Sequence, residues 1–377
     1  MMSSTAGAPS MTSMPLLREA TLNDYEAIVA LEQANGLKPR SREEWARFWT
    51  ENPLYPALSG ACPIGWVLED EETGRIVGTL SNVPLPYTFR GRHILAATGR
   101  GWAVDPAYRV FAPLLLDEYI HQNADVLLST TVNGLAEASH TICEQTRVPV
   151  GDWARAAFRV TNYNGFANVA LRLKKVPGVL SPLAAVALWI KDRLGKGAAL
   201  PANPSGWTVT RSREFSKAFD EFWIDLQKAK AGKLLGVRTQ SVLEWHFGAK
   251  AKSGGLRVLT ASGSDGRMAA YAVLVRSDHQ ESGLKRMRVA DFQSLDPGSN
   301  PALIRAAVEV CREEGVHALE LVGCELPAFE EWEAILPYRR ALPAWCNFFH
   351  SNDPVLMASL HNPEAWEPSS FDGDSSL

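Results

Sequence analysis

The sequence lacks the features by which several classes of protein are recognised. Its 377 residues include only five cysteines, which are scattered and form no Cys-x-x-Cys pair. This pattern excludes a disulfide-rich scaffold and a cysteine zinc site, and it is typical of free thiols in a reducing compartment. The formal net charge of −4 supplies no basic field that would attract nucleic acid. We therefore expect a cytoplasmic protein that binds no metal and no nucleic acid.

Secretory and membrane-spanning segments are also missing from the printed sequence. The first fifteen residues, MMSSTAGAPSMTSMP, have no basic region followed by an apolar one, so we predict a disordered leader over residues 1–14. Residues 179–190 are the most membrane-like stretch, but such a helix is only about 18 Å long against a hydrocarbon core of about 30 Å. Lysine and arginine flank it. It is either an amphipathic linker helix packed on the domains or a helix in weak contact with a membrane surface.

Apolar periodicity predicts the same order of elements twice, β-α-α-β-β-β-α-β-α-β. The expected fold class is therefore α/β (α+β), with two mixed, mostly antiparallel sheets flanked by helices. Pro84 and Pro86 are expected to interrupt a strand. Tryptophans at helical spacing are expected in the core: Trp45, Trp49, Trp223 and Trp245.

Three landmarks recur 191 or 192 residues apart, which predicts an internal duplication. They are Gly74-Arg75 with Gly266-Arg267, Asp105-Pro106 with Asp296-Pro297, and Trp153 with Trp345. The resulting domains are residues 15–160 and 206–350, joined by a linker with an amphipathic helix over 161–205. Residues 351–377 form an acidic tail with five carboxylates and no lysine or arginine, which we interpret as solvated. The oligomeric state is left open.

The strand order, with Val-Asp-Pro-x-Tyr-Arg at residues 104–109, resembles the GNAT superfamily of acyl-CoA-dependent N-acyltransferases, and it does so twice. The resemblance implies transfer of an acyl group from acetyl-CoA or another acyl-CoA to a small-molecule amine. Carried over, the backbone at Trp102 and Val104 faces the thioester. Arg109 binds a phosphate, and the amides of the next three residues bind the pyrophosphate: Val110, Phe111 and Ala112.

The family loop has two glycines, and this chain has neither of them. Ala112 stands in the place of the first glycine, and Pro113 and Leu114 follow. The family pattern Asn-x-x-Ala-x-x-x-Tyr matches Asn133, Ala136 and His140. His140 stands where many relatives have the tyrosine that protonates the leaving thiolate, and its alternative is a histidine packed in its helix. We interpret the second half, which lacks a basic residue equivalent to Arg109, as a degenerate copy. The alternative function is an inactive scaffold or binding protein, for example in a polysaccharide or cell-envelope pathway.

Overall fold

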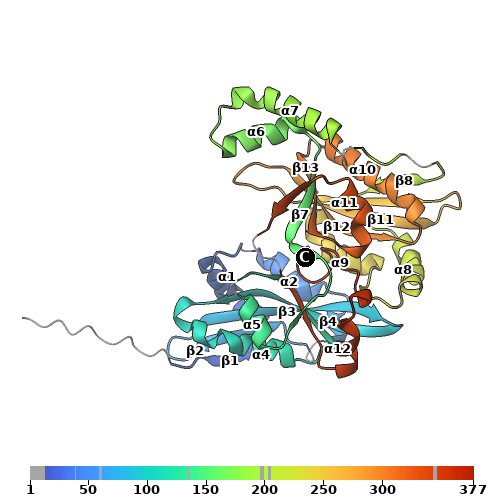
Figure 1. Ribbon diagram of the computed structural model, residues 1–377. Coiled ribbons are helices and arrows are strands. Elements are labelled where there is room, and N and C mark those ends of the chain that lie inside the picture. The colour runs from blue at the N-terminus through green and yellow to red at the C-terminus, as the bar shows by residue number, and fades with distance from the viewer. Residues whose placement is uncertain are drawn as a thin grey trace, which may run out of the picture. The chain divides into compact units, whose positions relative to one another are not determined.

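The structure is a computed structural model that describes residues 13–38, 40–58, 62–134, 136–195, 199–202, 205–342 and 346–377 (Figure 1). The predicted leader up to residue 12 and the landmark Trp345 lie outside the described residues. The chain forms two compact units. Each unit is built from two segments of the chain. Unit 1 comprises the residues up to Pro84 together with Ala97–Ala124, and unit 2 comprises Leu85–Ala96 together with Asp125–Leu377.

The first half contains the predicted order of strands and helices. Its strands are β1 (Leu16–Glu19), β2 (Gly65–Asp70), β3 (Arg75–Phe89), β4 (Arg92–Val104), β5 (Val126–Val132), β6 (Thr146–Arg147) and β7 (Asp152–Val160). Its α-helices are α1 (Tyr25–Ala34), α2 (Arg42–Thr50), α3 (Tyr55–Leu58), α4 (Ala112–His121) and α5 (Glu137–Ile142), with 3-10 turns η1 (Leu22–Asp24) and η2 (Pro106–Phe111). The predicted capping box at Ser41 is confirmed, since its side chain accepts from the Glu44 amide.

The second half repeats this order. Its strands are β8 (Thr208–Ser212), β9 (Leu235–Gly236), β10 (Leu256–Ser262), β11 (Met268–Arg276), β12 (Arg286–Ser294), β13 (Ala318–Cys324), β14 (Tyr338–Ala341) and β15 (Cys346–His350). Its helices are α8 (Ala218–Ala229), α9 (Gln240–Lys252), η4 (Pro297–Ser299), α10 (Asn300–Glu313), η5 (Pro327–Phe329), α11 (Glu330–Ala334), α12 (Pro354–Leu360) and η6 (Pro363–Ala365). The mixed α/β fold class is confirmed.

Equivalent turns mark the two halves. Gly74 and Gly266 both have positive φ, 65° and 76°, in the turns that join β2 to β3 and β10 to β11. Asp105 and Asp296 each cap the 3-10 turn that follows a strand, accepting the amide two residues on at 3.0 and 2.8 Å. These matched positions support the predicted duplication.

The strands pair in two sheets. The strand order within unit 1 is β1-β2-β3-β4. The end of β3 and the start of β4 belong to unit 2, where the strand order is β3-β4-β5-β15-β6 and β9 also pairs with β3. The second sheet, entirely in unit 2, has the order β14-β7-β13-β12-β11-β10-β8. The two halves exchange their last strands, because β7 pairs with β13 and β15 pairs with β5. The sheets therefore do not follow the predicted domain ranges.

Helices cover both faces of the second sheet. One apolar cluster packs α10 and α11 on residues that include Met287, Val289 and Leu319, and another packs α8 and α9 on the opposite face, on Val258 and Val273. The four tryptophans predicted in the core are each at most 6% exposed. These layers hold β12 and β13 in the centre of the sheet.

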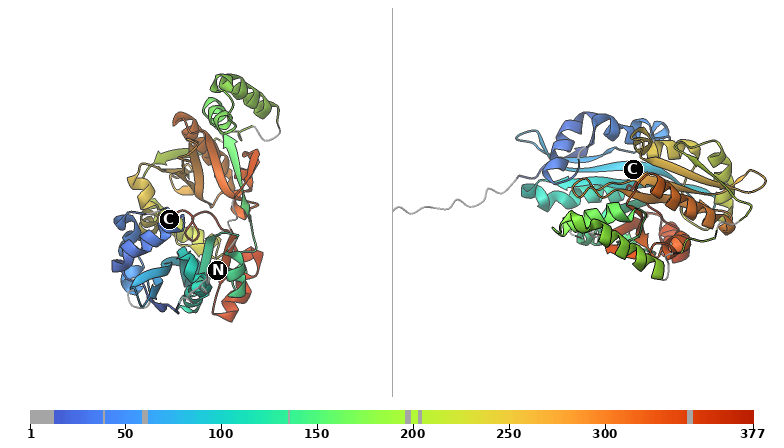
Figure 2. Two further views of the ribbon diagram at one scale, coloured as in Figure 1. Left: turned by 90° about the vertical axis from the view of Figure 1, so that its left-hand side faces the viewer. Right: turned by 90° about the horizontal axis from the view of Figure 1, so that it is seen from above.

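The linker forms a helical hairpin. Helices α6 (Tyr163–Leu173) and α7 (Ser181–Leu194), joined through η3 (Gly178–Leu180), pack against each other beside the second sheet (Figures 1 and 2). No helix within the described ranges is long and apolar enough to cross a bilayer.

Two local expectations are corrected. β3 continues through Pro84 and Pro86 to Phe89, and the carbonyls of both prolines accept hydrogen bonds, from Asn52 and Val237. A proline interrupts a strand only where its missing N–H is needed in the ladder. The acidic tail is solvated only in part: residues 361–364 are exposed, but residues 365–377 are mostly buried, and Asp372 and Asp374 are hydrogen-bonded in unit 2.

Candidate functional site

The predicted cofactor residues of the first half lie on β4, η2 and α4 in unit 1. Val104 is buried at the end of β4, whereas Trp102 is half-buried and Arg109 is exposed. The turn after β4 is fixed by Asp105, which caps η2 through the Ala107 amide. Because Arg109 is exposed, its side chain can reach an anion bound at this turn.

The amides after Arg109 belong to a helical segment and not to a glycine-like loop. Among the described residues, positive φ outside glycine occurs only at Arg90, Glu144, Lys175 and Glu325. The Ala112 amide donates to the Arg109 carbonyl, so it is already used. Val110 is 77% exposed, and Phe111 is half-buried. The turn keeps the order strand–turn–helix, but the Ala112 amide is not available to a pyrophosphate.

Asn133 and His140 belong to unit 2, whereas the other predicted residues belong to unit 1. The Asn133 side chain accepts from the Ala136 amide at 3.0 Å and so caps the turn before α5. His140 is 5% exposed and stacks on Phe348 at 5.4 Å between ring centroids. Its Nδ1 lies 2.7 Å from the Gln145 side-chain oxygen, which fixes Nδ1 as the donor. Burial lowers the pKa of His140 despite this hydrogen bond, so the imidazole is neutral near pH 7.

The second half contains a feature that sequence reasoning missed. β12 and β13 pair in parallel only from Arg286↔Ala318 to Val289↔Leu321, although both strands continue beyond these residues. On its other side, β12 pairs with β11 as far as Ser294, with one extra residue, Ala290, forming a bulge. From Ala290 onward β12 therefore has no ladder partner on the β13 side, and the bulge turns backbone groups toward that edge.

A buried polar network supports this part of β12. Arg238 donates to both oxygens of Asp291, at 2.9 and 3.1 Å, and the hydroxyls of Tyr271 and Ser369 donate to the same carboxylate. Although burial opposes ionisation, the Arg238 charge and these hydrogen bonds hold the pKa of Asp291 below its ordinary value. The network fixes β12 at the position where its pairing with β13 has ended.

Polar atoms left over at the same end of β12 suggest a ligand. Ser294 Oγ and Asn300 Oδ1 are buried and lack a hydrogen-bond partner among the described residues. Gln293 Nε2 is in the same state but lies on the opposite face of the sheet, where Gln293 accepts from Lys230. Such atoms are costly to bury without a partner. The residues lie at the end of β12 and the start of α10, with η4 and its glycine, Gly298, between them.

The signal that could have identified this site is the glycine of Asp296-Pro297-Gly298. The absence of a basic residue equivalent to Arg109 in this half favoured the interpretation of a degenerate copy. No group of three or more His, Cys, Asp or Glu side chains in the described part of the chain is placed to hold a metal ion.

One comparison with known proteins concerns the second half. Residues 199–332 match the family model described as Acetyltransferase (GNAT) domain. No curated protein matches the sequence. Among solved structures, a conserved protein of unknown function from Enterococcus faecalis V583, called a probable N-acyltransferase, is similar with a TM-score of 0.53 and 11% identity over 90% of this chain and 72% of that one.

Two further solved structures are similar to this chain. The N-myristoyltransferase of Saccharomyces cerevisiae, solved with bound myristoyl-CoA, has a TM-score of 0.54 at 11% identity, covering 92% of this chain and 81% of its own. A GCN5-related N-acetyltransferase from Kribbella flavida has a TM-score of 0.53 at 12% identity, covering 91% and 72%. At these identities the likeness concerns the fold. Together with the family match, it shows that this chain has the fold of the GNAT superfamily and carries a GNAT domain within residues 199–332.

Proposed function

We propose that this protein transfers an acyl group from an acyl-CoA to the amine of a small-molecule acceptor. The observation that carries the proposal is the parted strand pair in the second sheet, where β12 bulges at Ala290 and loses its β13 partner after Val289. The match of residues 199–332 to a GNAT domain supports acyl transfer by this half.

The chemistry needs a polarised thioester carbonyl, a neutral amine and a protonated leaving thiolate. Backbone N–H groups of β12 beyond Ala290 are the proposed donors to the developing oxyanion, a role that preorganised amides perform well. Ser294 Oγ and Asn300 Oδ1, buried and without partners in the described structure, are the proposed contacts to the cofactor. Holding the two substrates together supplies much of the remaining rate enhancement.

The first half is the alternative location for the cofactor. There Trp102 and Val104 would face the thioester, and Arg109 with the following turn would hold the phosphates. The family resemblance also implies a cofactor contact for Asn133 and the role of proton donor for His140. His140→Phe should then lower kcat by about a hundredfold or less and leave acyl-CoA affinity unchanged. An unchanged kcat would leave His140 as a packed residue.

Calorimetry with acetyl-CoA and longer acyl-CoAs tests the proposal directly. We expect dissociation constants in the tens to hundreds of micromolar, or about −5 to −6 kcal/mol. Ser294→Ala and Asn300→Ala should each weaken binding about fivefold, the value of one hydrogen bond, while Arg109→Ala should leave it unchanged. The reverse pattern would move the cofactor to the first half. If no acyl-CoA binds at millimolar concentration, the scaffold function replaces the enzyme.

The partners follow from the same proposal. The acceptor is a small amine. None of the five cysteines forms a disulfide, which supports a reducing compartment such as the cytoplasm. We also propose weak contact of residues 179–190 with a membrane surface, because apolar side chains of α7 are exposed beside lysine and arginine.

A further inference from the structure

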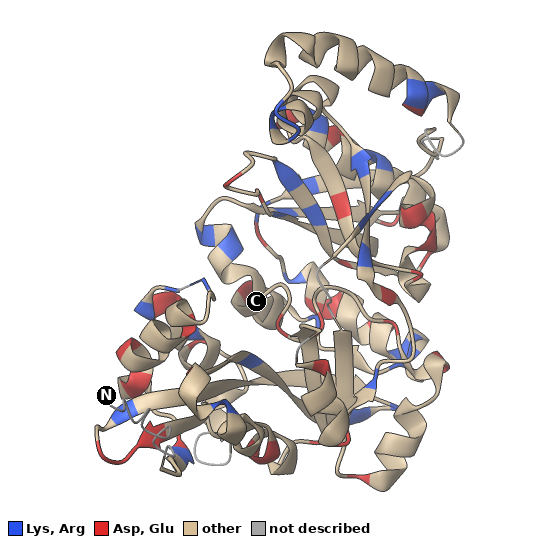
Figure 3. Cartoon of the chain, turned by 60° about the vertical axis from the view of Figure 1, so that its left-hand side comes forward, with Lys and Arg blue, Asp and Glu red and all other residues tan. Residues whose placement is uncertain are grey.

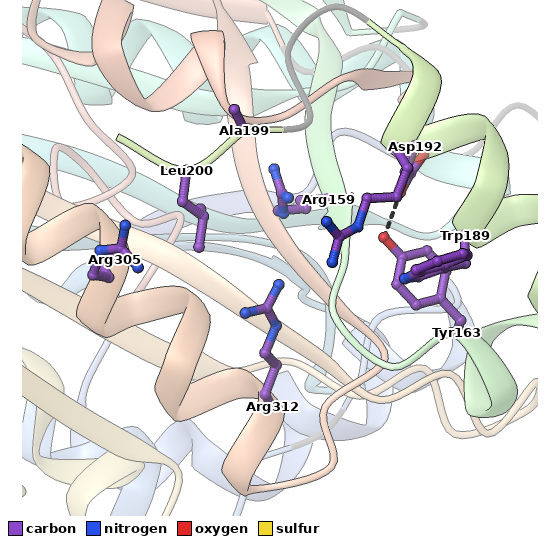
Figure 4. Close-up of a pocket in the computed structure, with 9 residues that line it drawn as sticks. Arg159, Tyr163, Trp189, Asp192, Ala199, Leu200, Arg305 and Arg312 are labelled. Atoms are coloured by element: carbon purple, nitrogen blue, oxygen red, sulfur yellow. Dashed lines mark hydrogen bonds between the residues drawn. The ribbon is translucent and has the colours of Figure 1, made fainter. Parts of the chain in front are cut away.

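A cavity of about 370 Å³ lies between the linker hairpin and the second sheet, wholly within unit 2. Its lining residues come from β7, α6, α7, α10 and the segment before β8: Arg159, Tyr163, Trp189, Asp192, Arg193, Ala199, Leu200, Arg305 and Arg312. Figure 4 shows Arg159 and Arg312 directed toward the same space, with Tyr163 and Asp192 beside it. The volume is within the usual range of small-molecule sites.

The lining has a strong excess of positive charge. Four arginines surround one carboxylate, Asp192. That carboxylate is occupied, because the hydroxyls of Tyr163, at 2.8 Å, and Tyr338 both donate to it. Burial and the Asp192 contact raise the pKa of Tyr163 to about 12, so the phenol stays a neutral donor. In the described structure, no carboxylate lies within ion-pair distance of Arg193, Arg305 or Arg312.

Burial of two of these arginines lowers the stability of the folded protein. Arg159 is 4% exposed, and burial lowers the pKa of its guanidinium, as does the nearby charge of Arg312. Arg305 donates to the Pro201 carbonyl at 2.6 Å, but its Nε is buried without a partner among the described residues. Desolvated like charges and an unused donor are expensive unless an anion compensates them.

Another basic cluster on the same sheet shows the contrast. Lysine and arginine gather on the strands of the second sheet (Figure 3), where Arg286, Arg288 and Arg340 all form ion pairs with the buried Glu320. That cluster contains its own counter-charge. Arg193, Arg305 and Arg312 have no carboxylate at ion-pair distance in the described structure, so an anion bound in the cavity would add the counter-charge beside them.

We propose that the cavity formed by Arg159, Arg193, Arg305 and Arg312 is a binding site for a phosphate group. Guanidinium groups bind phosphate through paired, charge-assisted hydrogen bonds, and a doubly charged phosphate offsets the excess of three positive charges better than a carboxylate does. The site does not depend on acyl transfer. The phosphate belongs either to a small soluble ester or to a lipid headgroup, since Trp189 and Arg193 of α7 adjoin the apolar side chains of that helix.

The test measures binding to the full-length protein by calorimetry. The soluble probes are inorganic phosphate and glycerol 3-phosphate, and the lipid probes are phosphatidylcholine vesicles with and without phosphatidic acid. The double variant carries Arg193→Gln and Arg312→Gln. Both side chains are exposed, so their loss should not disturb folding. The matched control is Arg213→Gln, which removes an exposed arginine outside the cavity.

Saturable binding of a phosphate probe with a dissociation constant of about 1 mM or tighter is expected, and the double variant should weaken it at least about tenfold. Arg213→Gln should bind as the unaltered protein does. Binding of glycerol 3-phosphate identifies a soluble ester, and binding only to vesicles with phosphatidic acid identifies a headgroup. The proposal is overturned if neither kind of probe binds, or if the double variant, with an unchanged melting temperature, binds as well as the control.

Discussion

At the scale of single residues, the surroundings of His140, the predicted proton donor, determine its protonation state. It is buried against Phe348 and hydrogen-bonded to Gln145, and its pKa lies below the ordinary value of 6.5 because burial disfavours the charged ring. In the unfolded chain the same imidazole titrates near its ordinary value. Below about pH 6.5 the unfolded state therefore takes up a proton that the folded state does not.

This difference predicts how stability depends on pH. The contribution of His140 to the free energy of unfolding is present above its unfolded pKa and is lost as the pH falls toward its folded pKa. Urea unfolding between about pH 7.5 and 5 should show a smaller decrease for His140→Gln than for the unaltered protein. His93→Gln, which changes an exposed histidine, should keep the original slope. Parallel slopes for all three proteins would contradict this assignment.

Arg238 and Asp291 give a second prediction at the residue scale. Both side chains are at most 1% exposed, so removing one leaves the other charge buried. Arg238→Met should lower the free energy of unfolding by about 3–5 kcal/mol. Adding Asp291→Leu should recover part of that loss, because the remaining charge is then gone. Urea unfolding of both variants provides the measurement, and a double variant less stable than the single one would disprove the argument.

At the scale of elements, the sequence predicts most of what the structure contains. The hairpins around Gly74 and Gly266, the capping box at Ser41 and the strand–turn–helix at Asp105 all depend on residues that are close in the chain, so local patterns identify them. The buried tail could not be predicted this way. Asp372 and Asp374 are satisfied by hydroxyls of Tyr87 and Thr130, which are more than 240 residues away.

Helix α7 is predicted to contact membranes through one side. Leu183, Val186 and Leu194 are 71%, 55% and 83% exposed, and they recur at helical spacing. Apolar side chains beside basic ones suit the surface of an anionic bilayer. The protein should sediment with vesicles of phosphatidylcholine and phosphatidylserine, and Leu183→Ser with Leu194→Ser should reduce the bound fraction at least about threefold.

The control for α7 is Val355→Ser, which removes a 73% exposed apolar side chain from α12. It should sediment as the unaltered protein does. If the unaltered protein stays in the supernatant, or if the α7 variant still sediments with the vesicles, α7 does not bind membranes.

At the scale of the whole chain, strand exchange ties the two halves together. The sequence predicts the duplication but not the exchange, because both arrangements use the same apolar strands in the same order. Only the pairing partners differ: β7 lies between β13 and β14, and β15 lies between β5 and β6. Neither half contains the neighbours that its own last strand needs.

A fragment of residues 13–160 should therefore not fold alone. In it β7 has no partner for Ala156, Ala157 and Val160, which are at most 1% exposed in the full chain, and β5 loses β15 from its edge. Exposed apolar strands with open edges associate with one another. Size-exclusion chromatography should show aggregates, and circular dichroism should show no cooperative melting. Production together with residues 161–377 should restore a soluble complex, since each fragment then supplies the strand that the other lacks. A monomeric 13–160 fragment that melts cooperatively at the temperature of the full chain would show that the exchanged strands are dispensable for folding.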